Sequence, residues 1–217
     1  MLRILFEKKG KAVWVSHLDL MRLFQRAFKR AGLKLKHTQG FNPRPSVSIA
    51  LPLSVGVDSK CELLDFELEN PVDCTKMPDM LNDKLIEGVR VLRAYEGGSK
   101  IRDLEYLRCI VSLEYDAGIP DGAEEHITNL FQKNEIIVPK KTKNGIQDQD
   151  LIPMICNIDV VRKEEHVLLD AIVCCQNPTL NPMQLVKAIE LYLPQYTPDY
   201  SSCSRIEIYN KNNEIFR

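Results

Sequence analysis

Apolar and polar residues alternate in five short segments of the first hundred positions, and two helical patterns lie between these segments. A two-residue repeat of apolar positions is typical of a half-buried strand. Such segments cover residues 2–8, 33–38, 46–51, 62–69 and 89–96. Apolar residues spaced as on one face of a helix occupy 16–31 and 74–88. With one alternating segment more than the four strands of such a unit, this order predicts a ferredoxin-like βαββαβ arrangement, with two helices on one face of an antiparallel sheet.

The boundaries of both helices carry local signals. Ser16, with Asp19 three residues later, is a capping-box variant that predicts a helix start. Gly32 suits the left-handed position that follows a helix. Pro78 is expected in the first turn of the second helix, where the missing N–H of proline is tolerated.

A polar linker at residues 97–103 precedes a second block, which is again βαββαβ with one extra strand. The predicted strands lie at 104–115, 135–141, 151–175 (two strands turning at 163–165) and 204–210, and the helices at 121–134 and 181–193. Asn181 is expected to cap the last helix, with Pro182 at its first position. The polar stretch 140–150 predicts a mobile loop or a hairpin tip.

The sequence therefore predicts an α+β protein made of two tandem ferredoxin-like (βαββαβ) units with antiparallel sheets. The first domain covers residues 1–98 and contains a basic helix and the loop GFNPRP, and the second covers 104–217. A chain of 217 residues is long enough for each part to bury a core of its own.

Composition indicates an ordinary globular protein, with 44% hydrophobic and 27% charged residues. No apolar run approaches the roughly 18 to 20 residues that cross a bilayer. The first residues, MLRILFEKKGK, lack the apolar core and cleavage site of a signal peptide. We therefore expect a cytoplasmic protein without a membrane partner.

Seven scattered cysteines include no C-x-x-C pair. Zinc and iron–sulfur sites need several thiolates or imidazoles that converge on one ion. Most of these cysteines fall within apolar strand patterns, where a thiol behaves as a small hydrophobe. We expect structural roles for them, and neither a metal nor a cofactor in this chain.

Positive charge is concentrated in the first 45 residues, which hold eleven Lys and Arg against two acidic residues, a formal charge of +9. Because the whole chain carries a formal charge of −1, the remainder carries −10. Such an asymmetry is typical of a region that faces a polyanion.

A helical projection of residues 16–31 separates an apolar face from a cationic stripe. The apolar face contains Leu20, Leu23, Phe24, Ala27, Phe28 and Ala31. The stripe contains Arg22, Arg26, Lys29 and Arg30, and the positive charge continues through Lys34, Lys36 and Arg44. These cations favour an anion-binding surface, because each phosphate that Lys or Arg neutralises releases counterions. The alternatives are a solvated helix face and pairing with the acidic remainder of the chain.

The loop GFNPRP has the features of a recognition element. Pro43 and Pro45 restrict the backbone on either side of Arg44, so less entropy is lost when that side chain binds. Gln39 and Asn42 offer further polar contacts. A nearby aromatic residue, Phe41, is a candidate either for stacking on a base or for covering the core. The prolines alone are also consistent with a well-built turn between strands.

His17 is the candidate catalytic residue, although a structural role is the more frequent one for a histidine on the apolar side of a helix. With Asp19 or His37 it would form an acid–base pair for RNA cleavage. No phosphate-binding, dinucleotide, zinc-protease or nucleophile-elbow motif occurs in the chain. His126 and His166 have no partner in the pattern and receive no role.

Residues 15–68 carry a family resemblance. Its markers are the S-H-L-D-L-x-R start at Ser16, the G-F-N-P-x-P loop at Gly40, the A-L-P-L-x-x-G-V turn at Ala50 and Glu62. They resemble the radical SAM-linked, or radical SAM-associated, family of uncharacterised bacterial proteins, and residues 145–155 resemble a later segment more loosely. The family occurs beside or fused to radical SAM proteins. The resemblance leaves open whether that partner also binds cobalamin. Since no C-x-x-x-C-x-x-C motif occurs, the resemblance implies a companion of the radical enzyme.

Together these patterns favour an RNA-binding accessory protein that works with a radical SAM enzyme in tRNA or rRNA modification or processing. The expected RNA contacts are Arg22, Arg26, Lys29, Arg30, Lys34, Lys36, Gln39, Asn42 and Arg44. A weaker architectural likeness, to the repeat-associated RNA-binding proteins of CRISPR systems, is of a kind that does not establish function. One alternative is an enzyme, ribonuclease-like or a subunit of an RNA-modifying one, with His17 as acid or base. A second alternative is a protein–protein adaptor whose basic face meets an acidic partner.

Overall fold

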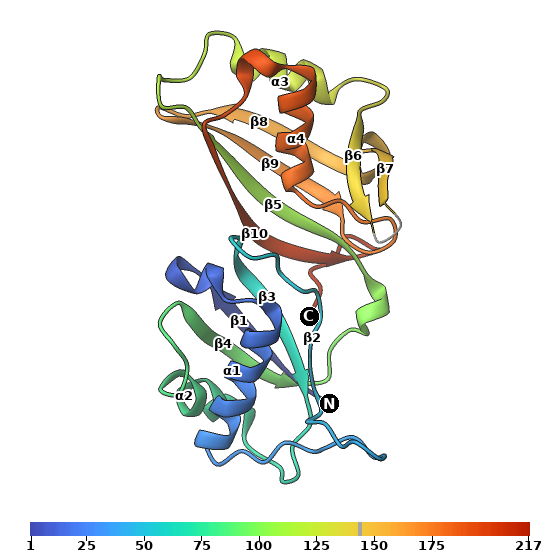
Figure 1. The fold of residues 1–217 in the computed structure, drawn as a ribbon. Coiled ribbons are helices and arrows are strands. Elements are labelled where there is room, and N and C mark those ends of the chain that lie inside the picture. The colour runs from blue at the N-terminus through green and yellow to red at the C-terminus, as the bar shows by residue number, and fades with distance from the viewer. Residues whose placement is uncertain (143–144) are drawn as a thin grey trace. The chain divides into compact units, whose positions relative to one another are not determined.

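The computed structural model describes residues 1–142 and 145–217. These residues form two compact units: unit 1 contains residues 1–101 and Arg217, and unit 2 contains residues 102–216 (Figure 1). Both units combine antiparallel β-sheet with short helices, which confirms the predicted α+β class. Within the described ranges, no helix is both long and apolar enough to span a bilayer.

Unit 1 is built on an antiparallel sheet with the order β4-β1-β3 and with β2 paired to β3. Its elements are β1 (Leu2–Lys8), a 3₁₀ helix (Gly10–Trp14), α1 (His17–Arg30), β2 (Val47–Ile49), β3 (Asp58–Phe66), a second 3₁₀ helix (Cys74–Lys76), α2 (Met77–Asn82) and β4 (Val89–Glu96). Leu64, Asp65 and Phe66 each pair with both β1 and β2. Strand β2 therefore lies on the edge of β3 opposite β1.

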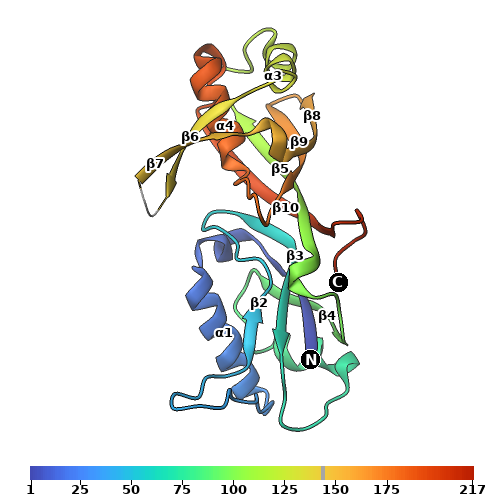
Figure 2. The same cartoon turned by 90° about the vertical axis from the view of Figure 1, so that its right-hand side faces the viewer.

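Helix α1 lies across one face of this sheet (Figure 2) and packs on it through aromatic side chains. The ring centroids of Phe6 and Phe24 are 4.8 Å apart, as are those of Phe28 and Phe66. All four rings are buried. Since burial of one phenylalanine stabilises the fold by about 1.5–3 kcal/mol, these contacts fix the rotation of α1 about its own axis. The face opposite Phe24 and Phe28 must then point to solvent.

The limits of α1 agree with the sequence signals. The hydroxyl of Ser16 accepts a hydrogen bond from the backbone N–H of Asp19 at 3.2 Å, as an N-cap residue does. Gly32, just beyond the helix, has a φ of 73°, a conformation that glycine adopts without strain.

Two predicted elements of unit 1 differ in the structure. Residues 33–38 form no strand but only isolated bridges, from Leu35 to Leu68 and from His37 to Pro45. The predicted helix at 74–88 is a 3₁₀ turn followed by α2, with Pro78 in the first turn as expected. It ends early because the amide of Asn82 both donates to the carbonyl of Val91 and accepts from its N–H, which ties the chain to β4.

Unit 2 repeats the arrangement with the sheet order β10-β5-β9-β8, again antiparallel, and a separate β6–β7 hairpin. Its elements are β5 (Leu104–Glu114), α3 (Ala123–Phe131), β6 (Ile137–Thr142), β7 (Gly145–Asp150), β8 (Ile155–Arg162), β9 (His166–Cys174), α4 (Met183–Tyr192) and β10 (Tyr200–Asn210). The predicted turn at 163–165 is confirmed. Of the predicted loop or hairpin tip at 140–150, residues 143–144 lie outside the described residues.

The start of α4 is one residue later than predicted. Pro182 is the N-cap and Met183 the first helical residue. Asn181 still contributes, since its side-chain oxygen accepts a hydrogen bond from the N–H of Met183 at 3.1 Å. The polar side chain therefore satisfies a free helix donor from just outside the helix.

Candidate functional site

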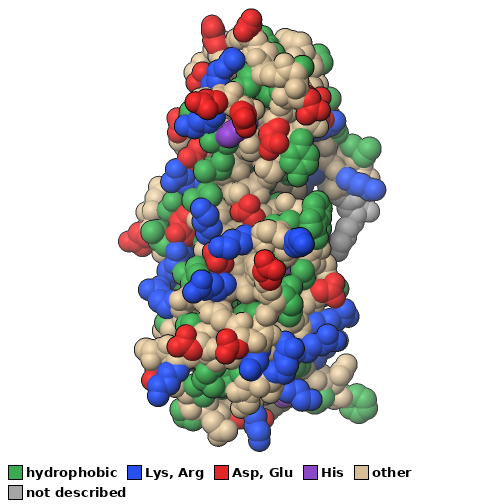
Figure 3. Space-filling model, turned by 90° about the vertical axis from the view of Figure 1, so that its left-hand side faces the viewer, with side chains coloured by type: hydrophobic (Ala, Val, Ile, Leu, Met, Phe, Trp, Pro, Cys, Tyr) green, Lys and Arg blue, Asp and Glu red, His purple; other side chains and the backbone are tan. Residues whose placement is uncertain are grey.

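The basic surface of unit 1 consists of the predicted cations, all of which are exposed. They are Arg22, Arg26, Lys29, Arg30, Lys34, Lys36 and Arg44. Figure 3 shows Lys and Arg side chains gathered at the lower right of one face of the molecule. Four of these residues come from α1, whose buried aromatic face turns them outward, and the others come from the chain that follows it.

Three cations of the basic surface have partners within the protein. The guanidinium of Arg22 donates to Asp19 at 3.1 Å on the exposed side of α1. Lys36 and Glu67 form an exposed ion pair at 3.4 Å. Arg30 donates to the backbone carbonyl of Lys84, which fixes its side chain but leaves its charge unopposed.

The remaining cations, Arg26, Lys29, Lys34 and Arg44, make no ion pair with any residue that the structure describes. Pairing with the acidic remainder of the chain therefore does not account for them. An exposed surface ion pair contributes at most about 1 kcal/mol, so the paired cations also remain available to a ligand.

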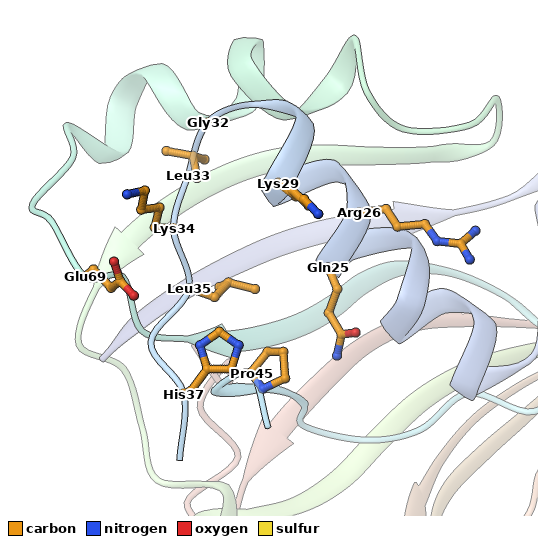
Figure 4. Close-up of a pocket in the computed structure, with 10 residues that line it drawn as sticks. All are labelled: Gln25, Arg26, Lys29, Gly32, Leu33, Lys34, Leu35, His37, Pro45 and Glu69. Atoms are coloured by element: carbon orange, nitrogen blue, oxygen red, sulfur yellow. The ribbon is translucent and has the colours of Figure 1, made fainter. Parts of the chain in front are cut away.

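A pocket of about 600 Å³, here called the α1 pocket, lies between α1 and the chain that follows it (Figure 4). Its lining comprises Gln25, Arg26, Lys29, Gly32, Leu33, Lys34, Leu35, His37, Pro45 and Glu69. The structure thus brings Arg26, Lys29 and Lys34 to one pocket. In Figure 4, Leu35 extends toward α1, whereas Arg26 and Lys34 extend to opposite sides.

Residues 33–37, in which buried and exposed side chains alternate as far as Lys36, form one wall of the α1 pocket. Leu33 and Leu35 are buried, and Lys34 and Lys36 between and after them are exposed. Although this segment is not a strand, its backbone is held in an extended path: the N–H of Lys36 donates to the carbonyl of Glu67, and the N–H of Glu69 donates to that of Lys34, both at 2.9 Å. The segment therefore presents apolar residues inward and cations outward.

The proline loop, residues 38–45, is closed at its base. The N–H of Thr38 donates to the carbonyl of Arg44 at 2.8 Å, and the N–H of Arg44 donates to the hydroxyl of Thr38 at 3.1 Å. Gln39, Asn42 and Arg44 are all exposed, but none of them lines the α1 pocket among the described residues. Of the predicted contact residues, some line the pocket and some lie on the loop, and a third group belongs to neither. The pocket has Arg26, Lys29 and Lys34, the loop has Gln39, Asn42 and Arg44, and the third group is Arg22, Arg30 and Lys36.

Phe41, at the tip of the proline loop, is fully exposed. The interpretation of this residue as a cover for the core is therefore wrong. A single exposed apolar side chain is common on protein surfaces, and Trp14 and Leu18 are exposed as well, so the exposure of Phe41 makes its ring available without identifying a ligand. Of the two roles open from the sequence, stacking is the one that the geometry permits.

His17, the candidate catalytic residue, is half-buried at the first position of α1, and it is not among the residues that line the α1 pocket. Its Nδ1 atom is buried and has no hydrogen-bond partner within the described chain. The carboxylate of Asp19 accepts instead from the hydroxyl of Ser16 and from Arg22, and these bonds lower the pKa of Asp19. His37 does line the pocket. The acid–base pair remains a prediction.

Several residues of the α1 pocket were not identified as contacts from the sequence. Gln25 lies on α1 between the two faces of the projection, and Pro45 and Glu69 approach the helix only through the tertiary fold. A local periodicity carries no signal for such residues. Within the described residues, no group of three or more His, Cys, Asp or Glu side chains is placed to hold a metal ion.

Comparison with solved structures shows similarity at the level of the fold alone. The chain titled "Crystal Structure of a Cbf5-Nop10-Gar1 Complex" matches with a TM-score of 0.51 and 12% identity, covering 95% of this chain and 48% of that chain. This protein thus spans about half the length of that relative. A chain titled "Crystal Structure of an Unknown Protein from Galdieria sulphuraria" matches at a TM-score of 0.27 and 12% identity, covering 94% of this chain and 96% of that one.

Comparison with protein families is more specific. No curated protein matches the chain. A family model, described as "Uncharacterized protein conserved in bacteria (DUF2344)", matches residues 1–182, which include all of unit 1 except Arg217 and most of unit 2. The chain therefore belongs to this bacterial family.

Proposed function

We propose that the protein binds RNA through unit 1. The observation that carries this proposal is the combination of Arg26, Lys29 and Lys34, exposed and without ion pairs in the described chain, with the fully exposed ring of Phe41. Cations that neutralise phosphates supply affinity through counterion release. An exposed aromatic ring supplies a stacking platform for an unpaired base.

The preference for RNA over an acidic protein partner rests on the proline loop. Lys and Arg alone would suit either ligand, since both are polyanions. A single aromatic ring beside Arg44 and Asn42 suits a planar base, which stacks on the ring and exposes polar edges to neighbouring side chains. The expected ligand is a structured RNA with unpaired nucleotides, and the protein–protein adaptor is the outcome that the test below must exclude.

The strand orders support the interpretation of both units as ferredoxin-like. In unit 1 the order is β4-β1-β3-β2, and in unit 2 it is β10-β5-β9-β8, so that each fourth strand pairs with its first. The partnership with a radical SAM enzyme and the catalytic role of His17 remain predictions from the sequence. Co-purification from a cell extract treated with nuclease would reveal such a partner independently of RNA.

The proposal is tested by the salt dependence of RNA binding. We expect the affinity of the protein for a labelled RNA with single-stranded regions to fall steeply with salt. The double variant Arg26→Glu, Lys29→Glu should lose at least tenfold in affinity. Its slope against the logarithm of salt should be shallower by about 1.4, since each phosphate contact to a single strand contributes about 0.7.

A matched control has the same change in net charge elsewhere. Lys163 and Lys211 are exposed residues of unit 2, and the double variant Lys163→Glu, Lys211→Glu should bind RNA with nearly unchanged affinity. An equal loss in both double variants would mean that only net charge matters. That result, or binding that is insensitive to salt, would refute the proposed surface.

A further inference from the structure

We propose that the α1 pocket holds one unstacked nucleobase, with the attached phosphate on Arg26 and Lys29. This inference rests on the proposed function, because it assigns the pocket to the same RNA. It goes further than the proposed function because it assigns different contacts with the RNA to two parts of unit 1. The proline loop and the outer cations would hold the strand, and the α1 pocket would read one base.

The size and lining of the α1 pocket suit a nucleobase. Its volume of about 600 Å³ lies within the range of about 300–1,000 Å³ that is usual for small-ligand pockets. Leu33, Leu35 and Pro45 contribute apolar surface, against which the faces of a planar ring can pack. A site for phosphate alone would instead be lined by polar donors, whereas these three residues are apolar.

The charges around the α1 pocket set the orientation of a bound nucleotide. Arg26 and Lys29 lie on α1, and Glu69 lies at the opposite end of the pocket in Figure 4, with Lys34 on the same side. The α1 end thus carries two positive charges, whereas the other end carries one charge of each sign. A phosphate is therefore attracted to Arg26 and Lys29, and the base is directed toward Glu69.

Two polar groups of the lining, Glu69 at the far end and Gln25 on α1, predict which bases bind. A carboxylate only accepts hydrogen bonds, so Glu69 favours a base that presents an exocyclic amino group. Cytosine has this group and uracil has a carbonyl oxygen at the same position. The amide of Gln25 can donate and accept, and it therefore tolerates either base. We expect cytidine to bind in preference to uridine.

The experiment measures binding of three small probes to the full chain by protein-observed NMR. The probes are cytidine 5′-monophosphate, uridine 5′-monophosphate and ribose 5-phosphate, which has the sugar and phosphate but no base. We expect cytidine monophosphate to bind about tenfold more tightly than ribose 5-phosphate, because stacking and burial of one base contribute on that scale. The amide signals of Gly32, Leu33 and Leu35 should shift.

Three variants separate the features of the site. Gln25→Phe fills the pocket without changing its charge, and it should bring cytidine monophosphate down to the affinity of ribose 5-phosphate. Glu69→Gln should reduce the preference for cytidine over uridine to less than twofold. Arg44→Ala, outside the pocket, should leave the binding of all three probes unchanged while weakening the binding of RNA. Circular dichroism checks that each variant is folded.

The outcomes distinguish this inference from the proposed function. If cytidine monophosphate and ribose 5-phosphate bind equally while RNA still binds to the basic surface, the α1 pocket is only an anion site and the inference is overturned. If RNA does not bind to the basic surface at all, the proposed function fails and the inference fails with it.

Discussion

At the scale of single residues, Phe41 is the side chain on which the proposed stacking of a base depends. Its apolar ring is fully exposed, and the hydrogen bonds between Thr38 and Arg44 hold the base of its loop. A side chain without intramolecular packing contributes little to stability, so its replacement should affect binding alone.

We therefore expect Phe41→Ala to lower the affinity for RNA by about tenfold, since stacking of one base contributes about 1–3 kcal/mol. The thermal unfolding midpoint should not change, because no core contact is lost. Affinity is measured by fluorescence anisotropy and stability by calorimetry. Phe41→Tyr, which keeps an aromatic ring, serves as the control and should retain binding. A loss of stability in Phe41→Ala would show that the ring packs against the protein after all.

The sequence predicted the cations of the site better than it predicted the pocket. The spacing of Arg22, Arg26 and Lys29 is a local property of one helix, so the projection was sufficient to place them on one face. Glu69 reaches the α1 pocket because residues 67–69 pair with the backbone of 34–36, and Pro45 reaches it through a bridge to His37. Such contacts depend on tertiary pairing, which no local pattern encodes.

At the scale of elements, the same distinction explains which boundaries were predicted. Helix α1 begins and ends at residues with local signals, Ser16 and Gly32, and both were identified. The early end of α2 depends on hydrogen bonds between Asn82 and Val91, nine positions later in the chain. The alternation at 33–38 arises because the side chains on one side of the segment are buried. It does not arise from pairing of the segment as a strand in the sheet.

The cap of α1 is a quantitative test at this scale. We expect Ser16→Ala to lower the free energy of unfolding by about 1 kcal/mol, because the N–H of Asp19 loses its acceptor. Ser16→Gly should cost only a few tenths of a kcal/mol, since glycine is itself a tolerated N-cap residue. Urea denaturation measures both values. If Ser16→Ala were as stable as the wild-type protein, the hydroxyl of Ser16 would not be acting as a cap.

At the scale of the whole molecule, a chain with a formal charge of −1 carries a positive surface because its cations are unevenly distributed. The first 45 residues have a formal charge of +9, and those of the basic surface are exposed. Local potential, rather than net charge, governs the approach of a polyanion to a surface. The proposed RNA contacts all lie in unit 1. We therefore expect RNA to make no specific contact with the surface of unit 2.

Mapping of RNA crosslinks on the full-length protein tests the central claim most directly. RNA that contains photoreactive uridine is bound, irradiated and digested, and the adducts are located on the protein by mass spectrometry. We predict adducts on peptides from the proline loop and the outer face of α1. Adducts confined to unit 2, or none above the level of an unirradiated sample, would contradict the assignment of unit 1 as the RNA-binding surface.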